Sequence, residues 1–339
     1  MSLFSGRKAP EVTPLEGVDV VLADLDGVLY QGANPIPHAV DALSRVAAEG
    51  IRTGFITNNA SRTDAQVAEH LTSFGLSVAA DDVVTSPQAA MRLMRERVQP
   101  GATILVVGGV GLTSEVEKAG YLVTREAADK PAAVVQGFAP EVGWKQLAQA
   151  SFALADPEVH WVATNTDWTI PVEGGIAPGN GTLVSAVHTA VGRLPVVAGK
   201  PETTIFEVAA VRFGAERAAF IGDRLDTDTL GAKRAGLRAI HVLTGIDRAK
   251  QLLAAPAGSR PDFIVQDLRQ LFEPYPVTST SKDGSETTVG RSVVRMKGHV
   301  VRVVKAGDEP VDLVRAGSAA IWNSGLSIHA LDVDPALYS

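Results

Sequence analysis

The chain begins its regular pattern with an apolar run, VDVVLADL, at Val18–Leu25. The run is almost wholly apolar until its acidic end, which is typical of a strand buried on both faces of a parallel sheet. An amphipathic pattern then predicts a helix at Ala39–Glu49, and a second apolar run predicts a strand at Ile51–Thr57. The expected order is strand, helix, strand.

The same alternation returns in the second half of the chain. Helices and strands are expected in turn at Thr204–Phe213, Ala218–Ile221, Thr229–Ala235, Ala239–Leu243 and Phe263–Val265. This alternation predicts an α/β fold with a doubly wound, Rossmann-like parallel sheet, in which ligands bind at the carboxyl ends of the strands. Three polar residues fall at such ends, namely Asp24, Thr57 and Asp223.

Between these halves lie further candidate strands, at Thr103–Val107, Ala133–Gln136 and His160–Thr164. A second, large α/β domain inserted into the first accounts for them. The expected boundaries are residues 1–75 and 198–274 for the two parts of the core, 76–197 for the insert, and 275–339 for a small α+β appendage.

The appendage has its own pattern. A proline- and serine-rich segment, EPYPVTSTSKDGSET at 273–287, is expected to be a linker. Alternating residues at Val289–Val304 around Gly298 predict a hairpin, and Pro310–Trp322 a helix. A unit this small buries little surface alone, so we expect it to dock on the core or on a partner chain and to carry no chemistry of its own.

Composition narrows the class of protein. No apolar run reaches the roughly 18 residues of a membrane span, and Met1–Thr13 is too polar for a secretory signal, so we expect a soluble, cytoplasmic protein without a membrane partner. The absence of cysteine excludes disulfides and thiolate metal sites, so any metal has oxygen or nitrogen ligands. A net charge of −7 argues against a nucleic-acid partner but not against an anionic substrate.

Asp24 and Asp26, in the segment DLDGVL, place two carboxylates where a buried strand leaves the sheet. A carboxylate can attack phosphorus to give an acyl phosphate. The other can protonate the leaving oxygen and then deprotonate the attacking water. Gly27 permits the tight turn that this arrangement needs, although an acidic turn at a strand end is the plainer alternative.

Two polar segments could complete a phosphate site. Thr57, Asn58 and Asn59 offer a hydroxyl and amides that suit a phosphoryl oxygen, although a helix cap has the same residues. Lys200, in the stiff turn GKPE, could neutralise both the phosphate and the nucleophile, although most single lysines are solvated surface.

The segment GDRLDTD brings three more acids to a strand end. Mg²⁺ prefers a few carboxylates with water and substrate phosphate, so Asp24, Asp223 and the carbonyl of Asp26 would suffice as ligands. Asp228 is then placed to orient Lys200 or a metal-bound water. A calcium loop is disfavoured because no glycine follows Asp228 where such a loop requires one.

Taken together, DLDGVL, ITNN, GKPE and GDRLDTD resemble the four motifs of the haloacid dehalogenase superfamily, in the expected order. The resemblance implies a magnesium-dependent phosphatase and the following roles: Asp24 as nucleophile, Asp26 as general acid and base, Thr57 and Asn58 as phosphate binders, Lys200 as charge anchor, and Asp223 as metal ligand. Halide chemistry is disfavoured, because dehalogenases of the superfamily lack the second aspartate.

The insert resembles the cap of the NagD and p-nitrophenylphosphatase-like branch, on the segment ATNTDWTIPVEGGIAPGNGTLVSAV. Members of that branch act on phosphoglycolate, glycerol 3-phosphate, pyridoxal phosphate or nucleotides. The resemblance is strongest to actinobacterial glycerol-3-phosphate phosphatases, which implies glycerol 3-phosphate as the first substrate to expect. The only expected partner is thus a small phosphorylated metabolite, and a homodimer stays open.

Substrate contact is expected from the cap residues Asn165, Asp167 and Trp168, although a core tryptophan and a capping aspartate explain the pattern equally well. Arg62 and Arg224 are further candidates, with surface ion pairs as the alternative.

Three other functions stay open at this stage. One is a mutase that returns the phosphoryl group to its substrate, and another is a regulatory protein with a vestigial site. The third is a bifunctional enzyme, since the appendage faintly resembles part of a GCN5-related acetyltransferase. However, it is about half the usual length, and Arg315–Ser318 lacks the pyrophosphate-binding pattern.

Overall fold

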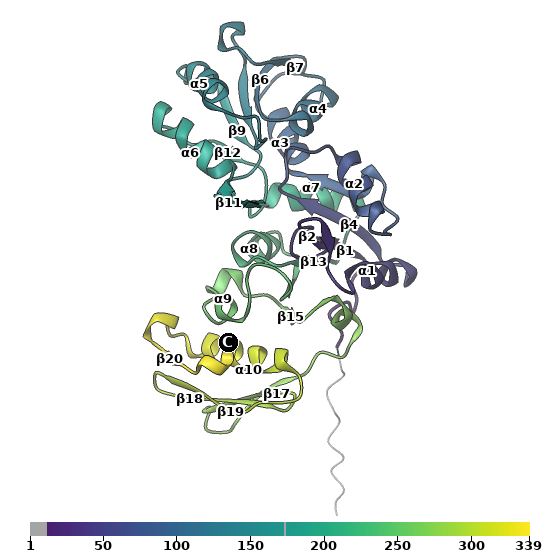
Figure 1. Cartoon of the computed structure of the whole chain (residues 1–339), viewed down its shortest axis with the longest axis vertical. Helices are drawn as coiled ribbons and strands as arrows, with labels where there is room; N and C mark the ends of the chain where they lie inside the picture. Colours follow the sequence, from purple (N-terminus) through teal and green to yellow (C-terminus); the bar gives the residue numbers. More distant parts are fainter. Residues whose placement is uncertain (1–11, 173) are drawn as a thin grey trace, which may run out of the picture.

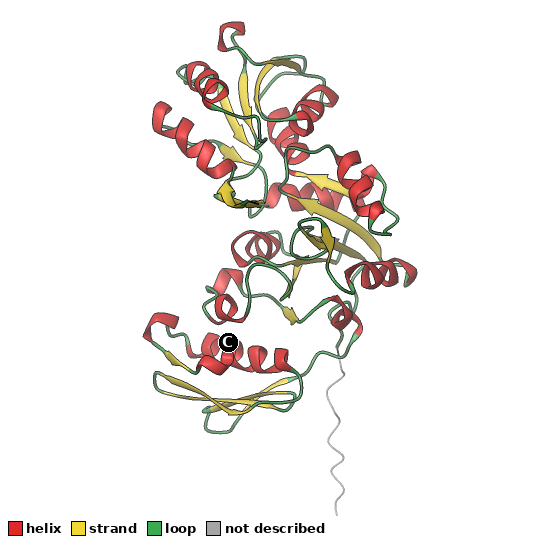
Figure 2. Ribbon diagram, viewed as in Figure 1, coloured by secondary structure: helices red, strands yellow, loops and turns green. Residues whose placement is uncertain are grey.

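The computed structural model describes residues 12–172 and 174–339. Three units follow one another along the long axis of the molecule, with the insert at one end, the core in the middle and the C-terminal unit at the other end (Figure 1). Sheets flanked by helices make up the first two units, as Figure 2 shows. Within the described ranges, no helix is both long enough and apolar enough to cross a bilayer.

The core is a six-stranded parallel sheet in the order β15-β14-β13-β1-β4-β5. Its central strand β1 (Val20–Ala23) is buried along its whole length, as the continuous apolar run predicts. The other strands are β4 (Arg52–Thr57), β5 (Val83–Thr85), β13 (Ala218–Gly222), β14 (Arg238–Val242) and β15 (Phe263–Val265). The predicted doubly wound α/β core is confirmed.

Helices cover both faces of this sheet. One face packs on α1 (Ala39–Ala48) and α2 (Asp64–Ser73). The other packs on α3 (Ser86–Arg95), α7 (Thr203–Phe213) and α8 (Leu230–Arg234). The remaining core elements are the hairpin β2 (Tyr30–Gln31) and β3 (Asn34–Pro35), the helix α9 (Ala249–Leu253), and the 3-10 turns at Ala80–Asp82, Ala257–Ser259 and Leu268–Phe272.

The insert has a second parallel sheet, in the order β12-β9-β8-β6-β7. Its strands and helices are β6 (Thr103–Val107), α4 (Val110–Lys118), β7 (Leu122–Thr124), β8 (Ala133–Gln136), α5 (Trp144–Ala153), β9 (His160–Ala163), α6 (Asn180–Val191) and β12 (Val196–Val197). A 3-10 turn lies at Ala127–Asp129, and a hairpin is formed by β10 (Thr169–Val172) and β11 (Gly175–Pro178). The strands expected at Thr103–Val107 and Ala133–Gln136 are confirmed.

The first boundary of the insert was predicted wrongly. β5 pairs in parallel with β4, with Phe55 opposite Val83 and Thr57 opposite Thr85, so residues 83–85 belong to the core sheet and not to the insert. A strand of three residues carries too little periodicity to be assigned from sequence. The apolar side chains of α3 then join core residues such as Leu22 to insert residues such as Ile104 in one cluster.

The C-terminal unit is a five-stranded sheet in the order β16-β17-β18-β19-β20, with one long helix, α10 (Pro310–Ser324). Its strands are β16 (Thr278–Thr280), β17 (Glu286–Val289), β18 (Ser292–Lys297), β19 (Val300–Lys305) and β20 (Asp332–Val333), with 3-10 turns at Ile328–Ala330 and Pro335–Leu337. The hairpin around Gly298 is confirmed. The predicted linker at 273–287 is wrong in part, because it supplies β16 and the start of β17. In Figure 1, α10 lies between this sheet and α9 of the core.

Candidate active site

Three neighbouring strands of the core bring their carboxyl ends together. Asp24 follows β1, Thr57 ends β4 and Asp223 follows β13, and β1 lies between the other two strands. The main-chain N–H of Asp24 donates to the carbonyl of Ile221 at 2.8 Å, which extends the pairing to the site itself. All three side chains are buried.

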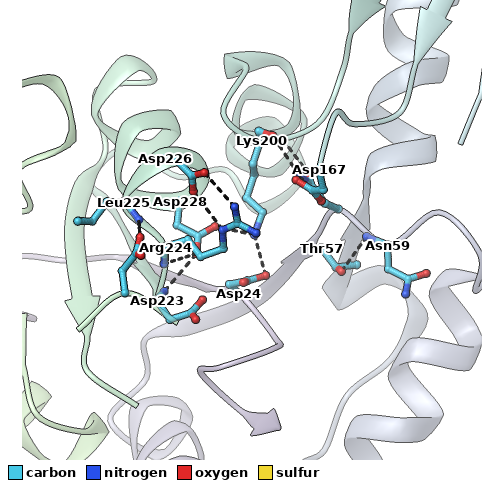
Figure 3. Close-up of polar contacts among 12 residues, drawn as sticks. Asp24, Thr57, Asn59, Asp167, Lys200, Asp223, Arg224, Leu225, Asp226 and Asp228 are labelled. Atoms are coloured by element: carbon cyan, nitrogen blue, oxygen red, sulfur yellow. Dashed lines mark hydrogen bonds and ion pairs between the residues drawn. The ribbon is translucent and has the colours of Figure 1, made fainter. Parts of the chain in front are cut away.

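Lys200 reaches this edge from the loop that returns from the insert. Its Nζ lies 2.7 Å from Oδ1 of Asp24 and 2.7 Å from Oδ1 of Asp228 (Figure 3). Burial alone would lower the pKa of Lys200, but the two carboxylates outweigh it and the net pKa is raised. Lys200 is therefore a permanent cation in the site.

A main-chain N–H binds the Asp223 carboxylate, and two glycines leave space for it. The N–H of Ile246 donates to its Oδ2 at 2.7 Å. A Cβ on Gly245 would lie 1.9 Å from the same oxygen, and a Cβ on Gly27, whose φ is +80°, would lie 2.3 Å from it. Glycine at both positions is what leaves room for the carboxylate. Burial, with the charge of Asp228, raises the pKa of Asp223 to about 7.

Asp228 is fully buried and uses both its oxygens on the protein. Oδ1 faces Lys200, and Oδ2 accepts the main-chain N–H groups of Asp223 and Arg224, each at 3.1 Å. The residue lies in a five-residue π-helix at Leu225–Thr229, an irregularity that often occurs at functional sites. Asp228 therefore fixes Lys200 and the start of the loop that carries Asp223.

Carboxylate oxygens of Asp24, Asp223 and Asp228 lie within 4.8 Å of one another. Within the described residues, Oδ2 of Asp24 and Oδ1 of Asp223 accept no hydrogen bond. When ionised, the three carboxylates exceed the charge of Lys200 by two. Hard oxygen donors with surplus negative charge fit Mg²⁺, and the carboxylates of Asp24 and Asp223 are the groups that could hold it.

Asp26 is exposed and lies directly before a turn. The turn is closed by a hydrogen bond of 2.8 Å from the N–H of Gly27 to the carbonyl of Tyr30. Although solvent reaches Asp26, the surrounding protein displaces much of its hydration, and this raises its pKa against the lowering effect of Lys200 and Arg62. A raised pKa favours the protonated acid.

The three predicted phosphate-binding residues after β4 behave differently from one another. Thr57 Oγ1 accepts the N–H of Asn59 at 3.1 Å, so its hydroxyl proton is left for another acceptor. Asn58 Oδ1 accepts the N–H of Lys200 at 2.8 Å, and its Nδ2 donates to the carbonyl of Lys200 at 3.1 Å. Asn59 Oδ1 accepts main-chain N–H groups of its own loop, from Ser61 and Arg62. The side chains of Asn58 and Asn59 thus bind main-chain groups and position the loops around the site.

Residues of the insert close over this edge of the core. Asn165 Nδ2 donates to the carbonyl of Asn58 at 2.8 Å, and Asn58 Nδ2 lies 3.2 Å from both carboxylate oxygens of Asp167. Figure 3 shows Asp167 beside Lys200. Burial raises the pKa of Asp167, while Arg224 lowers it. Trp168 is 65% exposed.

The two arginines have separate environments. Arg224 forms an ion pair with Asp226 at 2.9 Å. Arg62 is exposed and lines an open cavity of about 350 Å³ along α2.

Sequence reasoning missed the loop that follows β14. Besides Gly245 and Ile246, this loop supplies Asp247, whose Oδ2 accepts the N–H of Leu225 at 2.7 Å. The position of the loop could have indicated a role in the site, because the loop follows the carboxyl end of a predicted strand, where ligands bind in this fold class. Its segment TGID carries no pattern that specifies contact with Asp223.

Comparison with known proteins gives consistent results. A family model described as haloacid dehalogenase-like hydrolase matches residues 21–122, and a second, described as HAD-hydrolase-like, matches residues 197–271. The chain is 39% identical to D-glycerol 3-phosphate phosphatase of Mycobacterium tuberculosis, over 90% of this chain and 86% of that protein. It is 37% identical to glycerol-3-phosphate phosphatase of Gallus gallus, over 76% of this chain and 92% of that protein.

Among solved structures, the magnesium complex of the glycerol phosphate phosphatase from Mycobacterium tuberculosis superposes with a TM-score of 0.84 at 38% identity, covering 92% of each chain. That match extends over most of the C-terminal unit, because residues 1–274 alone would be only about four fifths of this chain.

Proposed function

The chain belongs to the haloacid dehalogenase-like hydrolases, and from that membership we propose that it is a magnesium-dependent phosphatase acting on glycerol 3-phosphate through an aspartyl-phosphate on Asp24. The coarser statement, that the chain is a phosphoric monoester hydrolase, rests on the two named relatives and the family match.

One observation carries the proposed mechanism. Lys200 holds one carboxylate oxygen of Asp24 at 2.7 Å, while the other accepts no hydrogen bond among the described residues. A carboxylate fixed by one oxygen and free at the other is oriented for attack, because little motion remains to be frozen when substrate binds.

In the first step, Oδ2 of Asp24 forms a bond to phosphorus as the bond from phosphorus to the ester oxygen breaks. Asp26 gives its proton to the departing oxygen, and its raised pKa favours the protonated form that this transfer requires. Lys200 offsets the negative charge gathered at the phosphoryl group.

In the second step, water attacks phosphorus and gives a proton to Asp26, which has become a base. The bond between phosphorus and Asp24 breaks, so phosphate leaves and both carboxyl groups return to their starting states. Thr57, whose hydroxyl donates to no acceptor within residues 12–172 and 174–339, is proposed to donate to a phosphoryl oxygen throughout.

Asp24, Asp223 and the carbonyl of Asp26 are the proposed ligands of Mg²⁺. When bound, the ion would shield the repulsion between the Asp24 carboxylate and the phosphate dianion. Among the protein groups alone, burial and the nearby acids Asp228 and Asp223 raise the pKa of Asp24 despite Lys200. A divalent cation favours the ionised nucleophile under these conditions.

Glycerol 3-phosphate is proposed because both named relatives are glycerol phosphate phosphatases. Phosphoglycolate, pyridoxal phosphate and nucleotide monophosphates are the competing substrates. The insert, acting as a cap, would choose among them through Asn165, Asp167 and the exposed Trp168.

The test is to compare kcat/KM for these phosphomonoesters while measuring inorganic phosphate. The proposal predicts phosphate release, the highest kcat/KM for glycerol 3-phosphate, loss of activity in EDTA and recovery with Mg²⁺. Phosphate that stays on the organic product would instead indicate a mutase.

A further inference from the structure

The loop that carries Asp223 shares an apolar cluster with the C-terminal unit. Leu225, two residues after Asp223, is 6% exposed and packs in a cluster whose buried members include Val311 of α10, itself 1% exposed. The other buried members are Leu243, Leu252, Ala255 and Ile264, and the partly buried Val314 and Trp322 of α10 pack against them. The tail thus forms part of the packing beneath the metal-binding loop.

Hydrogen bonds connect this cluster to Asp223. The N–H of Leu225 donates to Asp247 Oδ2 at 2.7 Å, and the N–H of Asp247 donates to the carbonyl of Asp223 at 3.1 Å. The N–H of Ile246 donates to the Asp223 carboxylate. The segment 244–248 therefore binds both the main-chain carbonyl and the carboxylate of Asp223, and it leads directly into α9.

Helix α10 is fastened to α9 and to β15. Trp322 Nε1 donates to the carbonyl of Leu252 in α9 at 3.0 Å. The guanidinium of Arg315, 7% exposed, donates to the carbonyl of Ile264 from Nε at 2.8 Å and from Nη2 at 2.6 Å, and pairs with Asp312 at 2.8 Å. A buried charge with these directional partners specifies one docking position for the helix.

We propose that the C-terminal unit is a positioning element of the metal site. Through Val311 and Trp322, α10 supports α9 and Leu225, and these in turn fix the two loops that hold Asp223. The inference rests on the proposed function, since it concerns the affinity of that site for Mg²⁺. It also goes beyond the expectation from sequence that the tail takes no part in the chemistry.

The physical basis is that a close-packed interior transmits a local change to its neighbours. Shortening a buried valine leaves a cavity that the surroundings fill only in part. At Val311 the side chains bordering such a cavity include those of the Leu225 cluster, so the loop gains freedom and its carboxylate is less well placed. A small displacement of a metal ligand weakens binding.

The test compares two valines of the C-terminal unit in the full chain. Val311→Ala removes methyl groups from the cluster with Leu225, whereas Val301→Ala removes the same groups from β19, in the cluster that the tail's own sheet and α10 form with Leu253, and that lacks Leu225. Isothermal titration with Mg²⁺ alone, well below the melting temperature, gives the affinity without reference to activity.

We expect Val311→Ala to weaken Mg²⁺ binding by about threefold to tenfold, less than the roughly 10- to 100-fold typical of groups that bond a ligand directly. Val301→Ala should leave the affinity within about twofold of the wild type, although both variants melt earlier. If Val311→Ala does not fold, Trp322→Phe, which removes the bond to Leu252 together with part of the ring that packs on the cluster, is measured in its place.

Unchanged affinity in the Val311 or Trp322 variant, or an equal loss in the Val301 control, would overturn the inference and leave the tail a stabilising unit only. A wild-type chain that binds no Mg²⁺ would instead contradict the proposed function. The two failures are therefore distinguishable.

Discussion

Asn58 and Lys200 lie 142 positions apart in sequence and are joined by two hydrogen bonds, from the N–H of Lys200 to Asn58 Oδ1 at 2.8 Å and from Asn58 Nδ2 to the carbonyl of Lys200 at 3.1 Å. The amide thus pairs with the main chain of Lys200 much as a neighbouring strand would. A Cβ on Gly199 would lie 2.5 Å from Asn58 Oδ1, so the glycine before Lys200 is required for this approach.

Replacing Asn58 by alanine should therefore disturb Lys200 without touching its charge. We expect kcat to fall by about 100-fold, since displacements near 1 Å have effects of that order. Steady-state kinetics at saturating Mg²⁺ measure it, and circular dichroism checks that the fold is retained. If kcat is unchanged in a folded Asn58→Ala enzyme, Lys200 does not need this support.

A methyl group at Gly245 should impair the metal site directly. In Gly245→Ala the new Cβ would lie 1.9 Å from Asp223 Oδ2, so the carboxylate or the loop must shift. We expect Mg²⁺ affinity to fall by about 10- to 100-fold, measured by titration calorimetry. Gly143→Ala is the matched control, because its Cβ would meet Gln146 only at 3.8 Å; an equal loss there would contradict the assignment of Asp223.

Mg²⁺ binding should release protons in a pH-dependent way. The pKa of Asp223 is raised from 3.8 to about 7 in the folded chain, so without the ion Asp223 is mostly protonated below pH 7. With no cation bound, the folded chain binds this proton more tightly than the unfolded chain does. The free energy of unfolding therefore falls as the pH rises from about 4 to 7.

A bound cation requires the ionised form, so apparent Mg²⁺ affinity should rise up to about pH 7 and then level off. Calorimetry in buffers of different ionisation enthalpy should find close to one proton released per ion at pH 6 and about a tenth at pH 8. Proton release that does not differ between the two pH values would argue against Asp223 as the titrating ligand.

The part of the site formed by strand ends could be predicted from sequence. Apolar runs that stop at Asp24, Thr57 and Asp223 identify parallel strands, and parallel strands place their carboxyl ends at one edge. Lys200 could be predicted only through its resemblance to a motif, because it belongs to a loop and its position depends on the return from the insert.

What could not be predicted depends on contacts between distant segments. Asn58 has ordinary turn chemistry in sequence, and its bond to Lys200 exists only after the two parts of the core, which the insert separates in sequence, have come together. Gly245 shows no local sign that it faces a carboxylate. Val311 and Leu225 each look like unremarkable apolar residues of separate units, yet they share one cluster. β16 lies in the tail's polar segment at 273–287, and because its three residues are all exposed it has no apolar residue that would indicate a strand.

The most direct test of the account is to trap the phosphoryl group on Asp24. In Asp26→Asn the second step lacks its base, so hydrolysis of the intermediate should slow by about 100-fold or more. With 4-nitrophenyl phosphate the leaving group departs without needing a proton, so the first step should remain fast.

Rapid mixing of Asp26→Asn with this substrate should therefore give a burst of nitrophenolate equal to the number of active sites. Acid quench and peptide mapping should then find the phosphoryl group on Asp24, with no label in the Asp24→Asn enzyme. Nitrophenolate and phosphate appearing together without a burst, and without phosphate on Asp24, would contradict covalent catalysis by this residue.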